Sequence, residues 1–402
     1  MLDVVVVGGG PAGATAAYLL AGEGYRVALL EKERYPRRKP CGGGLTQRSL
    51  RILRELGLYS EDYVLHRTRR AEIVFYRAGK RVTVDARIAM TTREAFDSYL
   101  ARRAAEAGAE LHEGERAVRI EAAPGRVRVA TPRGVYEARA AVIAAGHPSP
   151  LAAMAGIRPR YRLAVAYEFD AQPPPGADAE TSYFYMNLEE RFAGYFWIFP
   201  KGGFANYGGG SWAETMKGIL GRHGGYREWL MWAASATGFK VPGLEEAVKR
   251  AEGHLLPAYN GSQPAHLVGD SVIAVGDSAG LVNALGEGIS SALASARVAA
   301  RTLAEQLSSG GLSRGELLAA AGPRLRREVL DDLSVTPRLV SAMERLPRTI
   351  AALVEEDAEA RRLLGAMIDY SMSFKDAYRR LAPKMLKHLG TALSELLRPG
   401  TP

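Results

Sequence analysis

The stretch Val4-Val5-Val6-Val7-Gly8-Gly9-Gly10-Pro11-Ala12-Gly13 decides the fold of this chain. Its four β-branched valines predict a short buried strand, and the small residues from Ala12 to Ala21 predict a helix directly after the turn. Gly8 permits the tight turn, Gly10 lets the backbone approach a pyrophosphate closely, and Gly13 lets the helix pack against the strand. The unpaired N–H groups at the start of this helix would then point at an anion.

A second strand and an acidic residue complete this unit. Arg26 to Leu30 predicts the strand, and Glu31 follows it at the spacing of about 20 residues that places an acid on a ribose hydroxyl. A chance glycine turn would not be accompanied by a strand, a helix and a terminal acid in register. We therefore predict an ADP-binding βαβ unit.

A second glycine-rich turn, Gly276-Asp277-Ser278-Ala279-Gly280, lies far along the chain. It follows the apolar strand Val272 to Val275, and Gly286-Glu287-Gly288-Ile289 then opens a predicted helix from Ser290 to Leu307. At the end of the strand Asp277 can bind a ribityl hydroxyl, while backbone amides face the phosphate and the flavin ring. Because an extended dinucleotide can be closed from both ends, the two turns favour FAD over NAD; the alternative for the second is an ordinary strand-to-helix turn.

We expect an α/β protein in which a two-dinucleotide-type FAD-binding Rossmann domain carries an inserted antiparallel β-sheet substrate domain and C-terminal helices. Alternating aromatic and polar residues from Tyr161 to Trp212 predict the antiparallel sheet. The expected divisions are 1–160 for the first part of the FAD-binding domain with its β-ribbon insertions, 161–260 for the substrate domain, 261–312 for the second part of the FAD-binding domain and 313–402 for the helical region.

Several local elements are predicted within the first part. Residues 71–85 predict a hairpin. Thr91 and Glu94 form a capping-box pattern at the start of a helix. Val135 to Ala138 and Ala140 to Ala145 predict two separate strands.

Composition narrows the class of protein. Of the 402 residues 47% are hydrophobic and 24% charged, as is ordinary for a soluble globular protein, and no apolar run approaches the roughly 18 residues of a membrane span. We expect a cytoplasmic protein.

The single cysteine, Cys41, excludes an intramolecular disulfide, and the seven histidines show no ligand spacing, so no metal is expected. The net charge of +9 indicates an anionic partner, namely anionic lipid or the FAD pyrophosphate, because no nucleic-acid motif is present.

The loop Pro40-Cys41-Gly42-Gly43-Gly44 places three glycines beside the cysteine. Glycines there would let the backbone approach a flat ring closely, so we place Cys41 near the flavin or the substrate channel. The alternative is a small buried hydrophobe in a tight loop. Arg93, in the first turn of the next helix, can reach a flavin hydroxyl or phosphate, or it can be a solvated surface residue.

An aromatic strand gives the substrate signal. At a period of two, Tyr195, Trp197 and Phe199 project from one face, where they can line an apolar cavity over the flavin or form ordinary sheet core. No Ser/His/Asp arrangement, paired-carboxylate signature or Walker loop is evident. We therefore name no catalytic side chain and expect flavin N5 to carry the chemistry.

The last predicted helix is amphipathic. Tyr378, Leu381, Ala382, Met385, Leu386 and Leu389 form its apolar stripe. Lys375, Arg379, Arg380, Lys384 and Lys387 occupy much of its other surface. Such a helix can lie in the interface of an anionic bilayer, or it can be a solvated helix packed on the core.

Taken together, these motifs resemble the geranylgeranyl reductase family of FAD flavoproteins, and within it the archaeal digeranylgeranylglycerophospholipid reductases. The resemblance rests on the two glycine turns, the cysteine loop, Arg93 with Phe96-Asp97, and the motif Tyr195 to Pro200. It implies FAD contacts from Ala12, Glu31, Cys41, Gly42, Arg93, Ala117, Asp277, Gly288 and Ile289. It also implies that Tyr195, Trp197 and Phe199 face a prenyl chain.

The implied reaction is stepwise saturation of geranylgeranyl double bonds in isoprenoid ether lipids, by hydride from reduced flavin N5 and protonation of the neighbouring carbon. The resemblance leaves the external reductant open among ferredoxin, reduced deazaflavin and NAD(P)H. A membrane-resident substrate also implies peripheral contact of a cytoplasmic protein with the inner face of the cell membrane.

The sequence departs from related flavoproteins at two places. Ala145-Gly146-His147-Pro148 lacks the Asp-Gly motif of flavin hydroxylases, and Asn283-Ala284-Leu285-Gly286 lacks the Pro and Thr common in the family. A flavin-dependent monooxygenase or hydroxylase is the nearest rival. Halogenases carry Trp-x-Trp-x-Ile-Pro, whereas Tyr195 and Phe199 hold the outer positions here. A non-catalytic prenyl-lipid carrier that retains FAD is the rival from another class.

Overall fold

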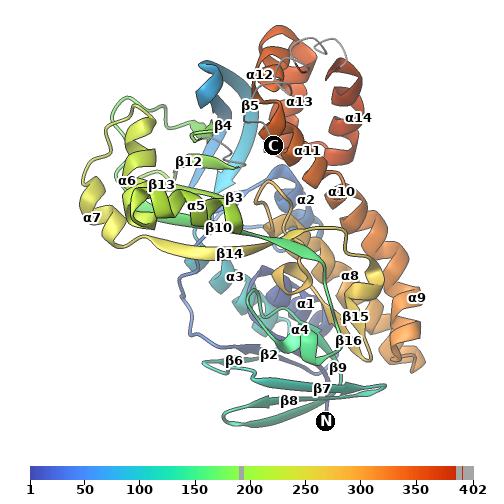
Figure 1. Ribbon diagram of the computed structural model, residues 1–402. Helices are drawn as coiled ribbons and strands as arrows, with labels where there is room; N and C mark the ends of the chain where they lie inside the picture. The colour runs from blue at the N-terminus through green and yellow to red at the C-terminus, as the bar shows by residue number, and fades with distance from the viewer. Residues whose placement is uncertain (190–193, 386–391, 393–402) are drawn as a thin grey trace.

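The computed structural model describes residues 1–189, 194–385 and 392 of the chain. Two eight-stranded sheets and a C-terminal set of helices make up the molecule (Figure 1). The first sheet and its helices lie in the lower half of Figure 1, and the second sheet lies above them.

The first sheet is the expected Rossmann-type sheet. Its main path runs in the order β15-β16-β9-β1-β2-β6, and every pair on it is parallel except β15 with β16. The strands are β1 (Leu2–Val7), β2 (Val27–Glu31), β6 (Glu110–Glu113), β9 (Gly134–Ile143), β15 (Val268–Gly269) and β16 (Val272–Ala274), with the antiparallel β7 (Arg119–Ala123) and β8 (Arg126–Thr131) continuing from β9. Because β1 pairs with β2 on one side and β9 on the other, the glycine turn after β1 lies at the centre of the sheet edge.

Three helices cover this sheet. They are α1 (Pro11–Gly22), α3 (Arg93–Glu106) and α8 (Ile289–Ser309), and α1 contacts both of the others. Valines 4 to 6 of β1 are completely buried, as is most of α8, which accounts for the small side chains of both segments. The remaining elements near this domain are α2 (Gln47–Glu55), α4 (Leu151–Met154), the 3₁₀ turns Pro264–His266 and Gly276–Ala279, and α9 (Arg314–Leu325). The 3₁₀ turn Tyr76–Ala78 belongs to the second sheet, where it joins two strands of the hairpin.

Two local predictions are wrong. The segments 135–138 and 140–145 form one strand, β9, because Arg139 does not interrupt it: its guanidinium donates to the carbonyl of Leu307 at 2.7 Å. Thr92, and not Thr91, caps α3, since its hydroxyl accepts from Ala95 N at 3.3 Å. Thr91 instead donates its N–H to Gly43 O at 2.8 Å, which ties it to the cysteine loop.

The second sheet has the order β14-β10-β13-β12-β11-β4-β5-β3 and is antiparallel except for the pair β11 and β4. Its strands are β3 (Gly44–Leu45), β4 (His66–Phe75), β5 (Lys80–Met90), β10 (Tyr161–Ala171), β11 (Thr181–Met186), β12 (Tyr195–Pro200), β13 (Ala205–Trp212) and β14 (Glu252–Tyr259). The predicted hairpin is therefore β4 and β5, and it extends the antiparallel-rich sheet.

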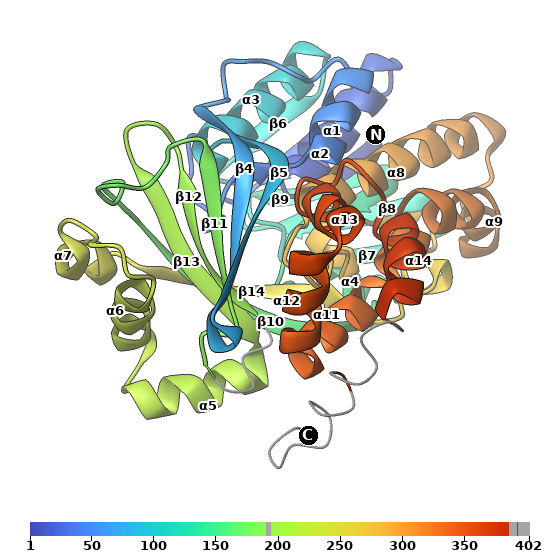
Figure 2. The ribbon, with the colours of Figure 1, turned by 90° about the horizontal axis from the view of Figure 1, so that it is seen from above.

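Helices cover the two faces of this sheet differently (Figure 2). On the outer face Phe196 and Ile198 of β12 pack in a core with Met216 and Trp229, which belong to α5 (Ala213–His223) and α6 (Tyr226–Ala236); α7 (Leu244–Lys249) follows. The other face, near β4 and β5, receives the C-terminal helices α11 (Thr336–Arg345), α12 (Pro347–Glu356), α13 (Ala358–Ile368) and α14 (Phe374–Met385), which follow the π-helical turn Arg326–Leu330 and α10 (Asp331–Leu333).

A close approach holds α13 on the sheet. A Cβ added at Gly365 would overlap the carbonyl of Asp85 in β5, so only glycine allows this packing distance. Among the described residues no helix is both long enough and apolar enough to cross a membrane.

Candidate active site

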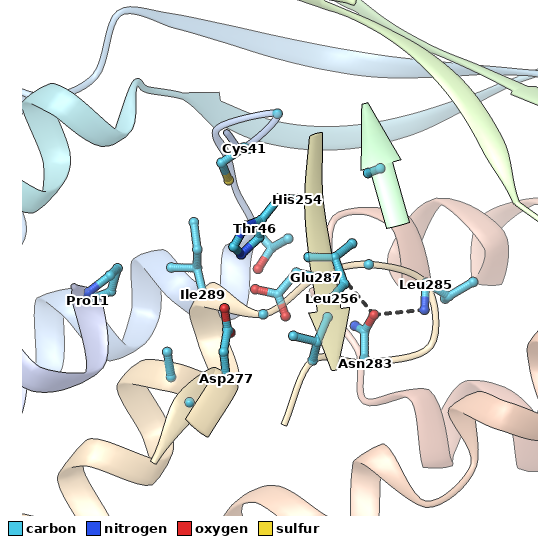
Figure 3. A pocket seen from close by; sticks show the side chains of 18 of the residues that line it. Pro11, Cys41, Thr46, His254, Leu256, Asp277, Asn283, Leu285, Glu287 and Ile289 are labelled. Carbon is cyan, nitrogen blue, oxygen red and sulfur yellow. Dashed lines mark hydrogen bonds between the residues drawn. The ribbon is translucent and has the colours of Figure 1, made fainter. Parts of the chain in front are cut away.

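A cavity of about 920 Å³ runs from the glycine turn after β1 to the C-terminal helices. Residues of both sheets and of α8 and α11–α14 line it. Figure 3 shows side chains from distant parts of the chain around it, including Cys41, His254, Asp277, Glu287 and Ile289. The two predicted halves of the cofactor site therefore meet in one space.

The first glycine turn is shaped as its sequence predicts. Gly8 has a φ of +100°, and a Cβ on Gly13 would overlap the carbonyl oxygen of Gly8. Gly8, Gly10 and Ala12 line the cavity, whereas Gly13 lies behind them at the helix–strand contact. No side chain caps the N-terminus of α1 and none of its first residues is acidic, so its N–H groups remain available to an anion.

Glu31 ends β2 beside this turn and is buried. One carboxylate oxygen accepts from Gly9 N at 2.9 Å and the other from Glu33 N at 3.0 Å. Arg37 lies 3.2 Å from the same carboxylate. The carboxylate faces the cavity with acceptor capacity for a ribose hydroxyl.

Arg93 lies in the cavity wall and is buried, which excludes the solvated alternative. It donates to both carboxylate oxygens of Asp97 at 2.7 Å. Burial alone would lower the pKa of Arg93, but the charge and hydrogen bonds of Asp97 outweigh it and raise the pKa. Arg37 lies 3.0 Å from the same Asp97, so two guanidinium groups share one buried carboxylate beside Gly10.

The second turn brings Asp277 to the opposite side of the cavity. Burial raises the pKa of Asp277, but Lys39 at 3.2 Å and the other nearby cations lower it overall, so the group is a carboxylate. A Cβ on Gly288 would lie 3.6 Å from the Asp277 carboxylate, which places the start of α8 beside it. Gly288 and Ile289 both line the cavity.

A loop between the second turn and α8 is closed by Asn283. Its side-chain oxygen accepts from Leu285 N at 3.0 Å and from Glu287 N at 2.9 Å (Figure 3). Glu287 in turn accepts from the N–H and the hydroxyl of Ser290, both at 2.7 Å, in the first turn of α8. In this chain, which lacks the Pro and Thr common in the family, the hydrogen bonds of Asn283 hold the loop.

These residues fit FAD. Two helix N-termini, two carboxylates and a side-chain-free backbone at Gly8 and Gly10 face one elongated cavity, as an ADP moiety and a ribityl chain require. Ala117 also lines the cavity. Of the predicted cofactor residues, Gly13 alone supports the site from behind.

The cysteine loop borders the same cavity. Cys41 is half-buried; its N–H donates to Glu168 Oε1 at 2.8 Å, and its sulfur accepts from Gly43 N at 3.4 Å. A Cβ on Gly42 would lie 2.9 Å from the ring of Phe199. The loop therefore packs directly on the aromatic strand.

Tyr195, Trp197 and Phe199 all line the cavity, together with Phe184 of β11. The Tyr195 hydroxyl donates to Leu285 O at 3.0 Å, and Trp197 Nε1 donates to Asn206 Oδ1 at 2.7 Å. Asn206 donates in turn to Asp170 at 2.8 Å. Because the polar atoms of this wall are engaged within the protein, the wall presents apolar surface to the cavity.

Beyond the aromatic wall the cavity becomes an apolar chamber between β4, β5 and the C-terminal helices. Its lining includes Ile73, Phe75, Ile88, Leu339, Met343, Ile350, Leu353, Val354, Leu364, Met367 and Ile368.

Part of the predicted membrane stripe faces this chamber. Tyr378, Leu381, Ala382 and Met385 line it, which favours the alternative of a helix packed on the core. Lys384 pairs with Asp357 at 2.7 Å and Glu359 at 2.9 Å, and Lys375 pairs with Asp331 at 3.0 Å. Leu386, Lys387 and Leu389 lie outside the described residues.

Four residues of the site were missed by sequence reasoning: Arg37, Lys39, Glu168 and His254. Arg37 and Lys39 lie in a loop whose charges look solvated in the sequence, yet each meets a site carboxylate. Glu168 is an acidic residue at a buried position of β10. Its place in the alternating pattern of that strand was the only feature of the sequence that could have indicated it. Nothing local distinguishes His254.

Comparison with known proteins agrees with this geometry. Residues 1–159 match the family model described as FAD binding domain, and residues 89–302 match FAD dependent oxidoreductase. Over 324 residues the chain is 31% identical to digeranylgeranylglycerophospholipid reductase 2 of Methanopyrus kandleri, covering 76% of this chain and 77% of that protein. Over 336 residues it is 30% identical to menaquinone reductase of Mycobacterium tuberculosis, covering 75% and 76%.

A crystal structure of a geranylgeranyl bacteriochlorophyll reductase-like protein from Thermoplasma acidophilum shares the fold. The TM-score is 0.72 at 22% identity, with 95% of this chain and 99% of that chain covered. The predicted fold class, the FAD cofactor and the predicted family are confirmed. The chain belongs to the FAD-dependent oxidoreductases of the geranylgeranyl reductase family.

Proposed function

We propose that this protein saturates the geranylgeranyl double bonds of isoprenoid ether lipids of the digeranylgeranylglycerophospholipid type, giving phytanyl chains. Bound and reduced, FAD would supply the hydride from N5. Gly8, Gly10, Ala12, Glu31, Arg93 and Ala117 would hold its ADP part. Cys41, Gly42, Asp277, Gly288 and Ile289 would hold its ribityl and flavin parts, and Tyr195, Trp197 and Phe199 would face the prenyl chain.

The observation that carries this proposal is the apolar chamber continuous with the cofactor cleft. A prenyl chain has no group that accepts or donates a strong hydrogen bond, so it is held by burial of its apolar surface. The hydroxyl of Tyr195 and the indole N–H of Trp197 are bonded within the protein, so a prenyl chain leaves neither of them unpaired. The names of the relatives support the same class of substrate.

Enclosure also serves the chemistry. An isolated alkene is a poor hydride acceptor, and a chamber that excludes water keeps reduced cofactor and substrate from side reactions. The aromatic wall and α11–α14 line the cavity on the side away from the predicted cofactor residues. Ferredoxin, reduced deazaflavin and NAD(P)H stay the three candidates for the external reductant.

Contact with the inner face of the cell membrane is proposed from the substrate alone. In the part of α14 that the structure describes, the apolar side chains Tyr378, Leu381, Ala382 and Met385 line the chamber. Binding to anionic vesicles tests for a membrane-contact surface.

The test is an anaerobic turnover with product analysis. The FAD-loaded protein is reduced with dithionite, mixed with digeranylgeranylglyceryl phosphate, and the lipid is examined by mass spectrometry. The expected product gains two hydrogens for each double bond reduced. An unchanged lipid beside competent reduced flavin overturns the lipid assignment, and a prenylated quinone in the same assay then tests the prenyl class.

The rival functions predict different results. A monooxygenase or hydroxylase consumes oxygen and NAD(P)H with an aromatic or apolar substrate and adds oxygen to it. A non-catalytic prenyl-lipid carrier binds the lipid without turnover after flavin reduction. The apolar chamber suits an apolar ligand in all three functions, so the product of the turnover separates them.

A further inference from the structure

One carboxyl interrupts the apolar surface at the boundary of cofactor cleft and chamber. In the register of the second sheet Glu168 of β10 lies opposite Gly208, Gly208 lies opposite Trp197, and Trp197 lies opposite Phe184. Partners in register share a face, so these residues form one row across the sheet. Glu168, Trp197 and Phe184 line the cavity. Gly208 contributes no side chain, so the row leads from a carboxyl directly to the aromatic wall.

The surroundings of Glu168 leave part of its carboxyl available. The residue is 6% exposed. Oε1 accepts from Cys41 N at 2.8 Å, and within the described residues no hydrogen bond engages Oε2. The carboxyl is thus fixed to the loop that packs on Phe199, with one oxygen not committed to the protein.

We propose that Glu168 supplies the proton that completes each double-bond reduction, an inference that rests on the proposed function. The hydride from reduced FAD forms a C–H bond to one alkene carbon. The π electron pair forms the second C–H bond with the Glu168 proton, whose O–H bond breaks and leaves a carboxylate. Solvent returns a proton to that carboxylate before the next double bond. Two electrons and two hydrogens enter the alkene, and the flavin is the group oxidised.

Three other carboxyl groups that line the cavity are engaged more fully within the protein. Glu287 accepts from Ser290 with both oxygens. Asp277 is paired with Lys39, and the Glu31 carboxylate accepts from two backbone N–H groups. Burial also raises the pKa of Glu287. Glu168 differs from it in the uncommitted Oε2 and in its row position beside the aromatic wall.

The charges around Glu168 are balanced so that it can exchange a proton. Burial raises the pKa of Glu168 to about 7, although the Cys41 N–H, Lys201 and Arg38 favour the carboxylate and Asp170 opposes it. From β14, Glu252 lies opposite it in register. The neighbouring His254 is neutral, because burial lowers its pKa to about 4. A general acid is most effective when its pKa lies near the working pH.

The first arm of the test is kinetic. Wild-type protein, Glu168→Gln and Glu168→Asp are loaded with FAD, reduced without oxygen and mixed with the lipid at several pH values. General acid catalysis is worth about 100-fold or more. We expect Glu168→Gln to lose about that factor in the rate of alkene reduction, with FAD binding and flavin reduction retained, and Glu168→Asp to recover part of it. The wild-type rate should fall as pH rises above about 7, and the Glu168→Gln rate should not respond there.

The second arm does not depend on turnover. Infrared spectra of the oxidised, FAD-loaded protein are titrated with pH. The wild-type minus Glu168→Gln difference should contain the carbonyl band of a protonated carboxylic acid that disappears as pH rises through about 7. Glu245→Gln is the control, because Glu245 of α7 is exposed and lies outside the cavity lining. It should change neither the band nor the rate.

Each outcome decides something. An unchanged rate and pH profile in Glu168→Gln overturns the proposal while the reductase function stands. A difference spectrum without a protonated-acid band also overturns it. A wild-type protein that reduces no prenyl substrate overturns the proposed function, and the proton role of Glu168 falls with it.

Discussion

The indole ring of Trp197 lies directly on the backbone of Gly208. A Cβ added at Gly208 would overlap Cζ2 of Trp197 and would lie 2.7 Å from the carbonyl oxygen of Tyr167. The hydrogen bond from Trp197 Nε1 to Asn206 fixes the ring in this position. The aromatic wall therefore depends on a glycine in the neighbouring strand.

Gly208→Ala should displace the Trp197 ring into the cavity. Overpacking of this kind costs about 1–3 kcal/mol, which urea unfolding should detect. Tryptophan fluorescence should shift, and lipid reduction should fall while FAD stays bound. Gly203→Ala is the control, because no atom lies within 4 Å of an added Cβ there. Equal stability and activity in the two variants would contradict this account of the wall.

Gly13→Ala should abolish FAD binding. The new Cβ would overlap Gly8 O and would push the start of α1 away from the cavity. Gly22→Ala, in the same helix and without a neighbour within 4 Å, should keep FAD and gain at most about 1 kcal/mol of stability. The flavin absorbance of the purified proteins is the measurement. A yellow Gly13→Ala protein would contradict the predicted role of this turn.

Glu168 should make stability depend on pH. Its pKa rises on folding from 4.5 to about 7, because burial disfavours the charged form. The folded state therefore binds the proton more tightly. The stabilisation is complete below pH 4.5 and is lost as pH rises through about 7, which amounts to about 3 kcal/mol.

Urea unfolding of wild-type and Glu168→Gln proteins across this range measures the effect. The stability of the wild type relative to the variant should fall with rising pH. The difference in unfolding free energy between wild type and the exposed-site variant Glu245→Gln should stay nearly constant with pH. If the difference in unfolding free energy between wild type and Glu168→Gln did not change with pH, the buried carboxyl would be ionised throughout the range.

Narrowing the chamber should restrict the chain length that it accepts. Leu364 of α13 lines the chamber, and Leu364→Trp would fill space in it. We expect reduction of geranylgeranyl chains to fall by about tenfold or more, and reduction of shorter geranyl chains to change little. Leu364→Met, which keeps the volume, should behave like wild type. Equal losses for both chain lengths would place the prenyl chain elsewhere.

The cofactor half of the site was predictable because its signals are local. A glycine turn between a strand and a helix fixes its own geometry, and Gly8, Gly10, Gly13, Glu31 and Asp277 lie where that geometry places them. The alternation of the aromatic strand likewise predicts which side chains share a face, and all three line the cavity.

The remainder depends on long-range register. Glu168 reaches Cys41 across 127 positions of sequence, and its place beside Trp197 depends on the pairing of β10 with β13. The sequence could not decide whether the apolar stripe of α14 contacts a membrane or the protein's own chamber, because both give the same amphipathic pattern. The described part of the stripe lines the chamber. Thr91 and Thr92 are chemically equivalent caps, and the hydrogen bond of Thr91 N to Gly43 O decides between them.

The most direct test of the central claim is the reoxidation of the reduced flavin in the absence of oxygen. Dithionite-reduced protein, freed of excess reductant, is mixed with digeranylgeranylglyceryl phosphate in a stopped-flow instrument while the flavin absorbance is recorded. The proposed function predicts that the oxidised spectrum returns, with one double bond saturated for each flavin oxidised. A flavin that stays reduced with the lipid and reoxidises only when oxygen is admitted would contradict it.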